Sequence, residues 1–173
     1  MRRLAIALLM VPLAGLAGSS LLGSVAHAAD PVATDLKPVD VLQVSGLFDS
    51  VQVRSVTDAI DRSEANGSQA LILQLNTSGA VVSDDEMRGL LQRVADAKVA
   101  VGIWVGPSRD ARAYGTPAQL FGVADVTAMV AGSRIGYTGA LLELDGAKVD
   151  LGPNGDQLRN GSKSFAEIGR AHV

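Results

Sequence analysis

The chain has no cysteine and only two histidines, His27 and His172, among its 173 residues. Both histidines lie near the chain ends, in segments that we expect to be absent from the mature native protein. Without them, the body has no groups for a Ser-His-Asp triad, a Cys-His pair or a zinc site built from histidine or cysteine. A disulfide framework is also excluded. We therefore expect the body to hold no metal and no cofactor.

Aromatic residues and basic runs are scarce as well. Only 3% of the residues are aromatic, whereas 47% are hydrophobic, so we expect a core of valine, leucine, isoleucine and alanine. The formal net charge is −3, and it becomes −5 once Arg2 and Arg3 are removed with the N-terminal segment. A mildly acidic chain without a basic run argues against nucleic acid as a partner.

The N-terminal 28 residues have the features of an export signal. Arg2 and Arg3 precede an apolar stretch at residues 4–22, and Ala26-His27-Ala28 forms a small-x-small cleavage site. We interpret residues 1–28 as a cleaved signal peptide, with a retained membrane anchor as the alternative. This interpretation predicts an exported, extracytoplasmic protein.

The last seven residues, 167–173, have a sequence that suggests a non-native origin. Glu-Ile-Gly-Arg-Ala-His-Val is encoded by GAG-ATC-GGA-AGA-GCA-CAC-GTC, which resembles a common sequencing adapter. We therefore expect the native gene to continue and this tail to be non-native, with a genuine seven-residue terminus as the alternative.

Between these ends, a polar linker at residues 29–38 precedes one α/β domain at residues 39–166. Short apolar runs predict parallel strands, and they lie at residues 39–45, 70–75, 99–105 and 126–131. Amphipathic stretches between the runs predict helices, and they begin at Asp49 or Ser50, at the Ser83–Glu86 capping box, and at Pro117. We expect residues 76–82 to form a loop and residues 140–166 to form a hairpin or extended arm, which would be poorly packed if the domain is cut short.

A dinucleotide-binding Rossmann domain is the competing α/β architecture. It requires a glycine-rich phosphate loop after a strand, and the loop at residues 76–80 (Asn-Thr-Ser-Gly-Ala) has a single glycine. No Walker-type Gly-Lys pair occurs in the chain either. The sequence therefore argues against both nucleotide-binding types.

Three blocks of the body resemble the NfeD-like membrane serine peptidases of the ClpP/crotonase superfamily. The first is residues 41–46, Val-Leu-Gln-Val-Ser-Gly, and the second is residues 73–80, which is similar to the family's Leu-x-Thr-Pro-Gly-Gly loop. The third comprises residues 105–108, 111–113 and 124–136, and it is similar to the family's Ala-Asp-x-x-x-Met-x-Pro-Gly-Thr-x-Ile-Gly. The resemblance implies a ClpP/crotonase-like domain of repeated strand-strand-helix units with parallel strands, incomplete at its C-terminus. It also implies transmembrane helices beyond this chain, a protein or peptide partner at the membrane and possible homo-oligomers.

The resemblance further implies a serine nucleophile with a lysine base, and an oxyanion loop with two glycines. Counted inward from the flanking motifs, the family's serine position is occupied by Gly115. Thr116 and Ser108 are the nearby hydroxyls that could replace it, although Thr116 also suits a helix cap and Ser108 a turn. The oxyanion loop corresponds to Ser78-Gly79-Ala80, and the candidate bases Lys148 and Lys163 lie where a base is expected, without a surrounding motif.

These observations favour a catalytically degenerate peptidase homologue that serves as an interaction or scaffold domain of a membrane protein. The first alternative is an active peptidase that uses a shifted Ser–Lys or Thr–Lys pair. The second is a crotonase-like binder of an acyl thioester, whose loop amides would hold the thioester oxygen. An exported domain would rarely meet an acyl-CoA, which weighs against that second alternative.

Overall fold

The structure is a computed structural model, and it describes residues 36–164 and 166–167. The signal peptide (1–28), most of the linker and residues 168–173 of the predicted tail lie outside the described residues. Among the helices of the described part, none is both long and apolar enough to span a bilayer.

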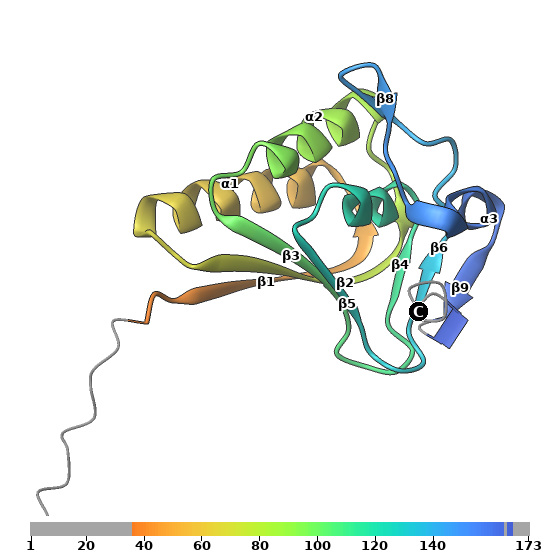
Figure 1. The fold of residues 1–173 in the computed structure, drawn as a ribbon, viewed down its shortest axis with the longest axis horizontal. Coiled ribbons are helices and arrows are strands. Elements are labelled where there is room, and N and C mark those ends of the chain that lie inside the picture. The colour runs from red at the N-terminus through yellow and green to blue at the C-terminus, as the bar shows by residue number, and fades with distance from the viewer. Residues whose placement is uncertain (1–35, 165, 168–173) are drawn as a thin grey trace, which may run out of the picture. The chain divides into compact units, whose positions relative to one another are not determined.

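The first half of the described chain alternates strands with helices (Figure 1). In chain order the elements are β1 (Val39–Phe48), α1 (Ser50–Asn66), β2 (Ala70–Ala80), α2 (Asp84–Ala95) and β3 (Ala100–Val105). Shorter elements follow: β4 (Arg112–Tyr114), the 3₁₀ helix η1 (Thr116–Gly122), β5 (Val126–Met129), β6 (Arg134–Gly136), β7 (Glu143–Leu144), β8 (Ala147–Lys148), the 3₁₀ helix η2 (Gly152–Asn154), α3 (Gly155–Asn160) and β9 (Ser162–Ser164). The predicted α/β class and the parallel strand–helix–strand units are confirmed.

The ends of α1 and α2 follow from their local sequence. The Asp49 side chain accepts hydrogen bonds from the first-turn amides of α1, and Gly67 ends that helix with φ 67°. Ser83 and Glu86 form the predicted capping box at the start of α2. These side chains satisfy helix-terminal N–H groups that have no partner within the helix. The predicted starts of both helices are therefore confirmed.

Strand β2 is the centre of a seven-stranded sheet and changes partners along its length. The order is β5-β3-β2-β4-β6-β9, and β1 pairs with β2. β2 pairs with β3 through Leu75, and beyond that point with β4. The expectation of a loop at residues 76–82 is therefore wrong for residues 76–80. That segment is polar, yet its backbone is paired with β1 as far as Ala80, after a register shift at Gly46/Leu47.

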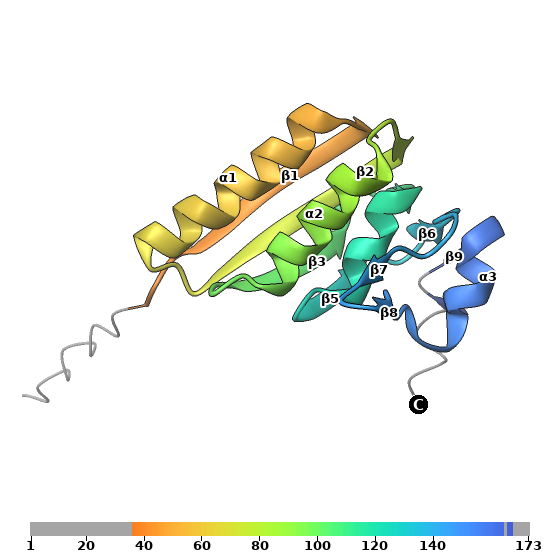
Figure 2. The same ribbon diagram turned by 90° about the horizontal axis from the view of Figure 1, so that it is seen from above.

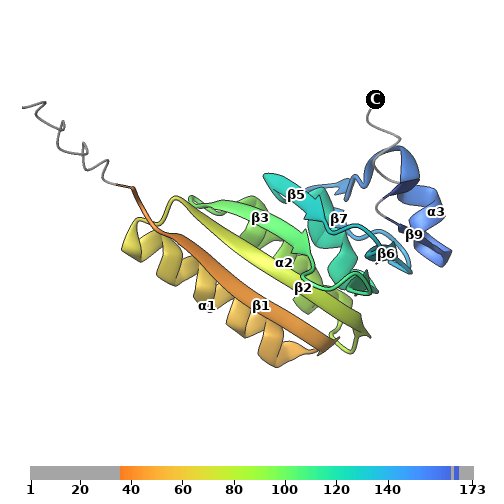
Figure 3. The same ribbon diagram turned by 90° about the horizontal axis from the view of Figure 1, so that it is seen from below.

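Two helices cover one face of this sheet (Figure 2). The core cluster contains alternate side chains of β2 (Leu71, Leu73 and Leu75) and the apolar stripe of α2, and all of these side chains are buried. The other face, seen in Figure 3, has no described helix over β1, β2 and β3. Val41 on β1 and Val126 on β5 are more than half exposed.

Residues 140–166 pack better than their sequence predicts. The expected hairpin is present as the antiparallel pair β7–β8. The segment then forms α3 and returns as β9, which pairs antiparallel with β6. Leu142, Val149 and Leu158 are at most 5% exposed. The expectation of a poorly packed arm is wrong, because these three widely spaced apolar residues reach the core although no periodic pattern announces them.

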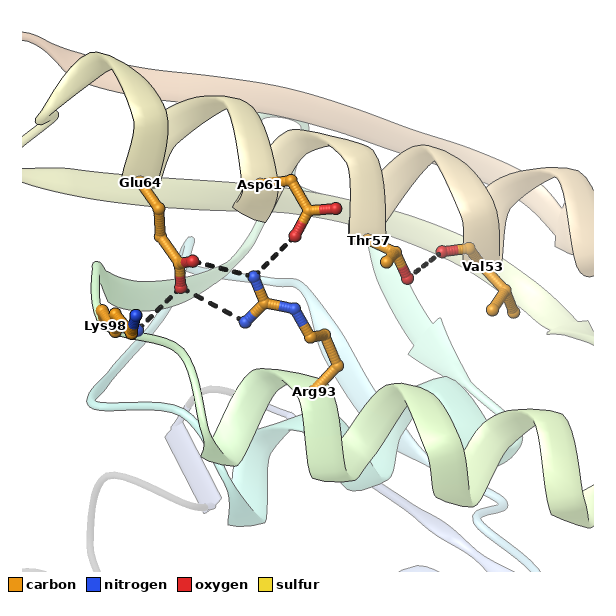
Figure 4. Close-up of polar contacts among 6 residues, drawn as sticks. All are labelled: Val53, Thr57, Asp61, Glu64, Arg93 and Lys98. Atoms are coloured by element: carbon orange, nitrogen blue, oxygen red, sulfur yellow. Dashed lines mark hydrogen bonds and ion pairs between the residues drawn. The ribbon is translucent and has the colours of Figure 1, made fainter.

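An ion-paired cluster joins the two long helices (Figure 4). Arg93 of α2 donates to both carboxylate oxygens of Glu64 at 3.0 and 3.2 Å and to Asp61 at 2.7 Å, both on α1. Glu64 also accepts the Lys98 backbone N–H at 2.8 Å, just before β3. The Arg93 guanidinium, and after it the Lys98 amide, lower the pKa of Glu64 below its usual value of 4.5. A single carboxylate thus links α1, α2 and the start of β3.

This lowered pKa predicts a pH-dependent contribution to stability. Because the folded state favours the ionised Glu64, its contribution is complete above about pH 4.5 and is lost as the pH falls through the folded pKa. Glu64→Gln should lower the urea midpoint at pH 7, and the difference from the parent should shrink towards pH 3. Asp58→Asn, at an exposed position of α1, is the control. A difference that stays constant over this pH range would contradict the assignment.

Candidate functional site

The register of β4 on β2 brings the predicted nucleophile position to the predicted oxyanion loop. Thr77 is opposite Ala113 and Ser78 is opposite Tyr114. The next residue of β4's path, Gly115, therefore comes beside Gly79, and its amide donates to the Gly136 carbonyl at 3.1 Å. Residues 36 positions apart in the sequence thus meet where the end of β2 runs parallel to the short strand β4.

Gly115 has a backbone that suits glycine and almost no other residue. Its φ is +82° and its ψ is −162°, a region that residues with a side chain avoid. A Cβ at this position would lie 3.2 Å from the Ala80 nitrogen and 3.2 Å from the Gly79 Cα. A side chain here would start from a strained backbone and press against the neighbouring turn. The site therefore lacks a hydroxyl at residue 115 and has little room for one.

The three residues of the predicted oxyanion loop form the end of β2. Ser78 is exposed, and Gly79 has a φ of +147°. Ala80 keeps a strand conformation and is not among the described residues with positive φ. Its amide nitrogen lies 3.2 Å from the Cβ position of residue 115. A glycine at position 80 is not required here, because the positive φ falls on Gly79.

The two substitute hydroxyls lie in different environments. Ser108 is in an exposed turn, where its carbonyl accepts from Ala111 at 3.1 Å and its hydroxyl bonds Asp110, lowering the pKa of that carboxyl. This agrees with a turn-forming role. Thr116 was expected to cap the helix at Pro117, but η1 has Gly115 as its N-cap and no side-chain cap. The cap prediction is wrong: the Thr116 Oγ1 is buried and, among the described residues, has no hydrogen-bond partner.

Neither candidate base pairs with a hydroxyl in the described part of the chain. Lys148 is exposed on β8. Lys163 lies on β9 opposite Ile135, and its side chain is 27% exposed with the Glu167 carboxylate 4.0 Å away. Glu167 also accepts from the Ser164 amide and hydroxyl at 2.7 Å. The structure thus brings together residues 78–80 and 115–116, and it gives the lysines other surroundings.

Sequence reasoning missed Gln119, which is fully buried in η1. Its amide nitrogen donates to the carbonyls of Thr138 and Ala140 at 3.2 and 3.0 Å, and its oxygen accepts the Leu142 amide at 2.9 Å. Gln119 therefore fixes the segment after β6 against the helix that follows Gly115. A glutamine in an otherwise apolar helix stretch (Ala-Gln-Leu-Phe) was the available signal.

Comparison with solved structures identifies the architecture. A lysine-to-alanine variant of the 1510-N membrane-bound stomatin-specific protease, in complex with a substrate peptide, matches with a TM-score of 0.56 and 25% identity over 71% of this chain and 56% of that chain. A serine-to-alanine variant of that protease matches with a TM-score of 0.63 and 21% identity over 79% and 77%. A Bordetella parapertussis structure, whose name assigns it to the enoyl-CoA hydratases/isomerases, matches with a TM-score of 0.51 and 16% identity over 78% and 67%. The chain has the ClpP/crotonase fold.

Within the ClpP/crotonase fold, the structural match confirms the resemblance seen in the three sequence blocks. The chain spans 56% of the length of the peptide-bound protease. No family model and no curated protein matches the sequence. Among residues 36–164 and 166–167, no group of three or more histidine, cysteine, aspartate or glutamate side chains is arranged to hold a metal ion.

The backbone at Gly115 predicts a large cost for the smallest side chain. Gly115→Ala should lower the free energy of unfolding by about 1–3 kcal/mol, because it places a Cβ in a glycine-only region. Gly139→Ala, with φ +70° and open space around its Cβ, should cost about 1 kcal/mol. Gly89→Ala, in an open position of α2, should stabilise by about 0.5–1 kcal/mol. Urea unfolding measures all three, and a neutral Gly115→Ala would contradict the assigned backbone.

The three hydrogen bonds of Gln119 predict that its removal destabilises the fold. Gln119→Leu keeps a similar volume but leaves the Leu142 amide and two carbonyls without partners, so unfolding should become easier by about 2–3 kcal/mol. The exposed Gln157 of α3 provides the matched control, Gln157→Leu, which should change stability little. Equal urea midpoints for both variants would refute the clamping role of Gln119.

Proposed function

We propose that this chain is an exported ClpP-fold domain that has lost peptidase activity and binds a protein or peptide partner at the membrane. Gly115 carries the proposal. It takes the place of the family's serine in the aligned motifs, it lies next to Gly79 and Ala80 at the end of β2, and it has no atom that could be acylated. Peptide hydrolysis through an acyl-enzyme requires a nucleophile at that point.

The backbone conformation at residue 115 supports the proposed loss of peptidase activity as much as the missing side chain does. A serine at residue 115 would need a different φ and would have to move the Gly79–Ala80 peptide, which is 3.2–3.3 Å from the Cβ position. The turn is therefore adapted to glycine, and a single reverse substitution should not rebuild a working nucleophile.

One observation favours the alternative of an active Thr–Lys peptidase. The buried Thr116 hydroxyl has no partner among the described residues, as an unengaged nucleophile would. A threonine nucleophile, however, needs a base within hydrogen-bond reach, and none contacts it in the described part of the chain. Inactivity therefore remains our proposal.

Binding of a partner draws support from two sources. The related protease has been solved in complex with a substrate peptide, so this fold holds peptides in at least one protein. The uncovered sheet face also exposes apolar side chains such as Val41 and Val126, which a protein partner would shield from water. The acyl-thioester alternative has support from the fold alone, and an unchanged melting temperature with coenzyme A would remove it.

An activity-based fluorophosphonate probe tests the proposal directly. The purified chain should not be labelled, and Gly115→Ser should remain unlabelled because the backbone there opposes a side chain. A known serine hydrolase treated in parallel shows that the probe is reactive. Labelling that disappears in Thr116→Ala but persists in Ser108→Ala would establish an active threonine and overturn the proposal.

A further inference from the structure

A hollow on the protein surface lies beside Gly115. It is a hollow of about 480 Å³, and it is lined by Arg109, Asp110, Arg112, Tyr114, Gly132 and Arg134. Three arginines and one aspartate give this lining a formal charge of +2, in a chain whose net charge is −3. The hollow is therefore positively charged, whereas the protein as a whole is negatively charged.

The strand register places two of these arginines side by side. Arg112 on β4 is the direct partner of Arg134 on β6, so both project from the same face of the sheet. Like charges opposite each other on neighbouring strands destabilise a sheet. None of the ion pairs among the described residues includes either arginine. An anion between the two guanidinium groups would remove this repulsion.

Neighbouring groups orient both guanidinium groups, and one carboxylate acts on each from nearby, Asp110 on Arg112 and Glu167 on Arg134, without forming an ion pair within 4.0 Å. Arg134 donates to the Ser162 hydroxyl and carbonyl on β9, each at 3.0 Å. Arg112 lies over the Tyr114 ring, 5.8 Å from its centre, and Tyr114 meets Tyr137 edge-on at 5.1 Å. These contacts hold the arginines in place at some cost to their freedom and leave further N–H donors for a ligand.

Several of the residues that line the hollow are close in sequence to Gly115. Tyr114 immediately precedes Gly115, and Tyr137 follows Gly136, the residue whose carbonyl accepts the Gly115 amide. A peptide that lies at the turn would therefore extend past the two tyrosines towards Arg112 and Arg134. The lining has no aliphatic side chain to enter a lipid layer, which disfavours a membrane surface as the ligand.

We propose that this hollow binds the carboxylate of an acidic peptide segment between Arg112 and Arg134. Carboxylates fit the planar arginine fork in a bidentate manner, and such charge-assisted pairs are among the stronger polar contacts. The inference rests on the proposed function in taking a peptide as the ligand of this domain. It adds the chemical class of that peptide.

Fluorescence anisotropy with two labelled peptides tests the inference. One peptide is an amidated Ala-Glu repeat and the other is the same sequence with glutamine in place of glutamate. The chain should bind the glutamate peptide at least about tenfold more tightly, and the preference should weaken at high salt. Arg112→Gln should weaken binding of the glutamate peptide about fivefold, and Arg112→Lys should recover only part of it because the fork is lost.

The control carries the same change of charge elsewhere. Arg54→Gln, at an exposed position of α1, should leave the affinity within about twofold, since that residue is outside the hollow. Equal binding of the two peptides, or equal weakening by Arg54→Gln and Arg112→Gln, would overturn the inference. So would binding to phosphatidylglycerol vesicles with no binding to the glutamate peptide.

Mass spectrometry of the same peptide mixtures separates this inference from the proposed function. An intact peptide that binds without glutamate preference would refute the arginine site alone. A peptide cleaved by the chain, with cleavage abolished in Thr116→Ala, would refute the proposed loss of activity, whatever the role of the arginines.

Discussion

The approach of Gly115 to the Gly79–Ala80 peptide is the contact around which the candidate site is built. It exists because β2 extends beyond the end of β3. β3 pairs with β2 only as far as Leu75, and the last residues of β2 pair with β4 instead. A three-residue strand is enough to set this position, since the register of parallel strands fixes which residue comes next. The positive φ of residue 115, together with a Cβ position only 3.2 Å from the end of β2, then favours glycine there. Fold and site are thus determined by the same change of strand partner.

Much of the fold could be predicted from local patterns. The capping box at Ser83 and Glu86, the cap at Asp49 and the apolar stripe of α2 are signals contained within a few residues. Strands β4 and β6 have no such signal, because each contributes one inward side chain, Ala113 or Ile135. Their pairing depends on segments 20 or more residues away. The polar end of β2 was mistaken for a loop for the same reason: its partners are distant, and its composition is that of a turn.

The candidate site, too, could be predicted from the sequence only in part. The family resemblance was sufficient to select residue 115 and residues 78–80 as candidate site residues, because aligning the motifs assigns each residue to a position of the family's site. It could not reveal the φ of Gly115 or the unpartnered hydroxyl of Thr116, which depend on how the chain turns after β4. Gln119 and the pairing of Arg112 with Arg134 were also invisible, because both are relations between distant segments. The sequence motifs selected the candidate residues, and the structure added the backbone geometry around them.

A binding site that has lost its nucleophile must retain its ligand by reversible contacts alone. In an acyl-transferring relative, part of the binding energy is used in the transition state, and the product leaves after hydrolysis. If the Gly115 site is inactive as proposed, no such step follows there, and the affinity for a peptide has to come from groups that contact it in its bound state. Exposed arginines are suited to this, because they attract a carboxylate over several ångströms and release it readily under salt screening. On this view the arginine hollow and the glycine at position 115 are two parts of one arrangement, in which recognition replaces cleavage and exchange stays fast.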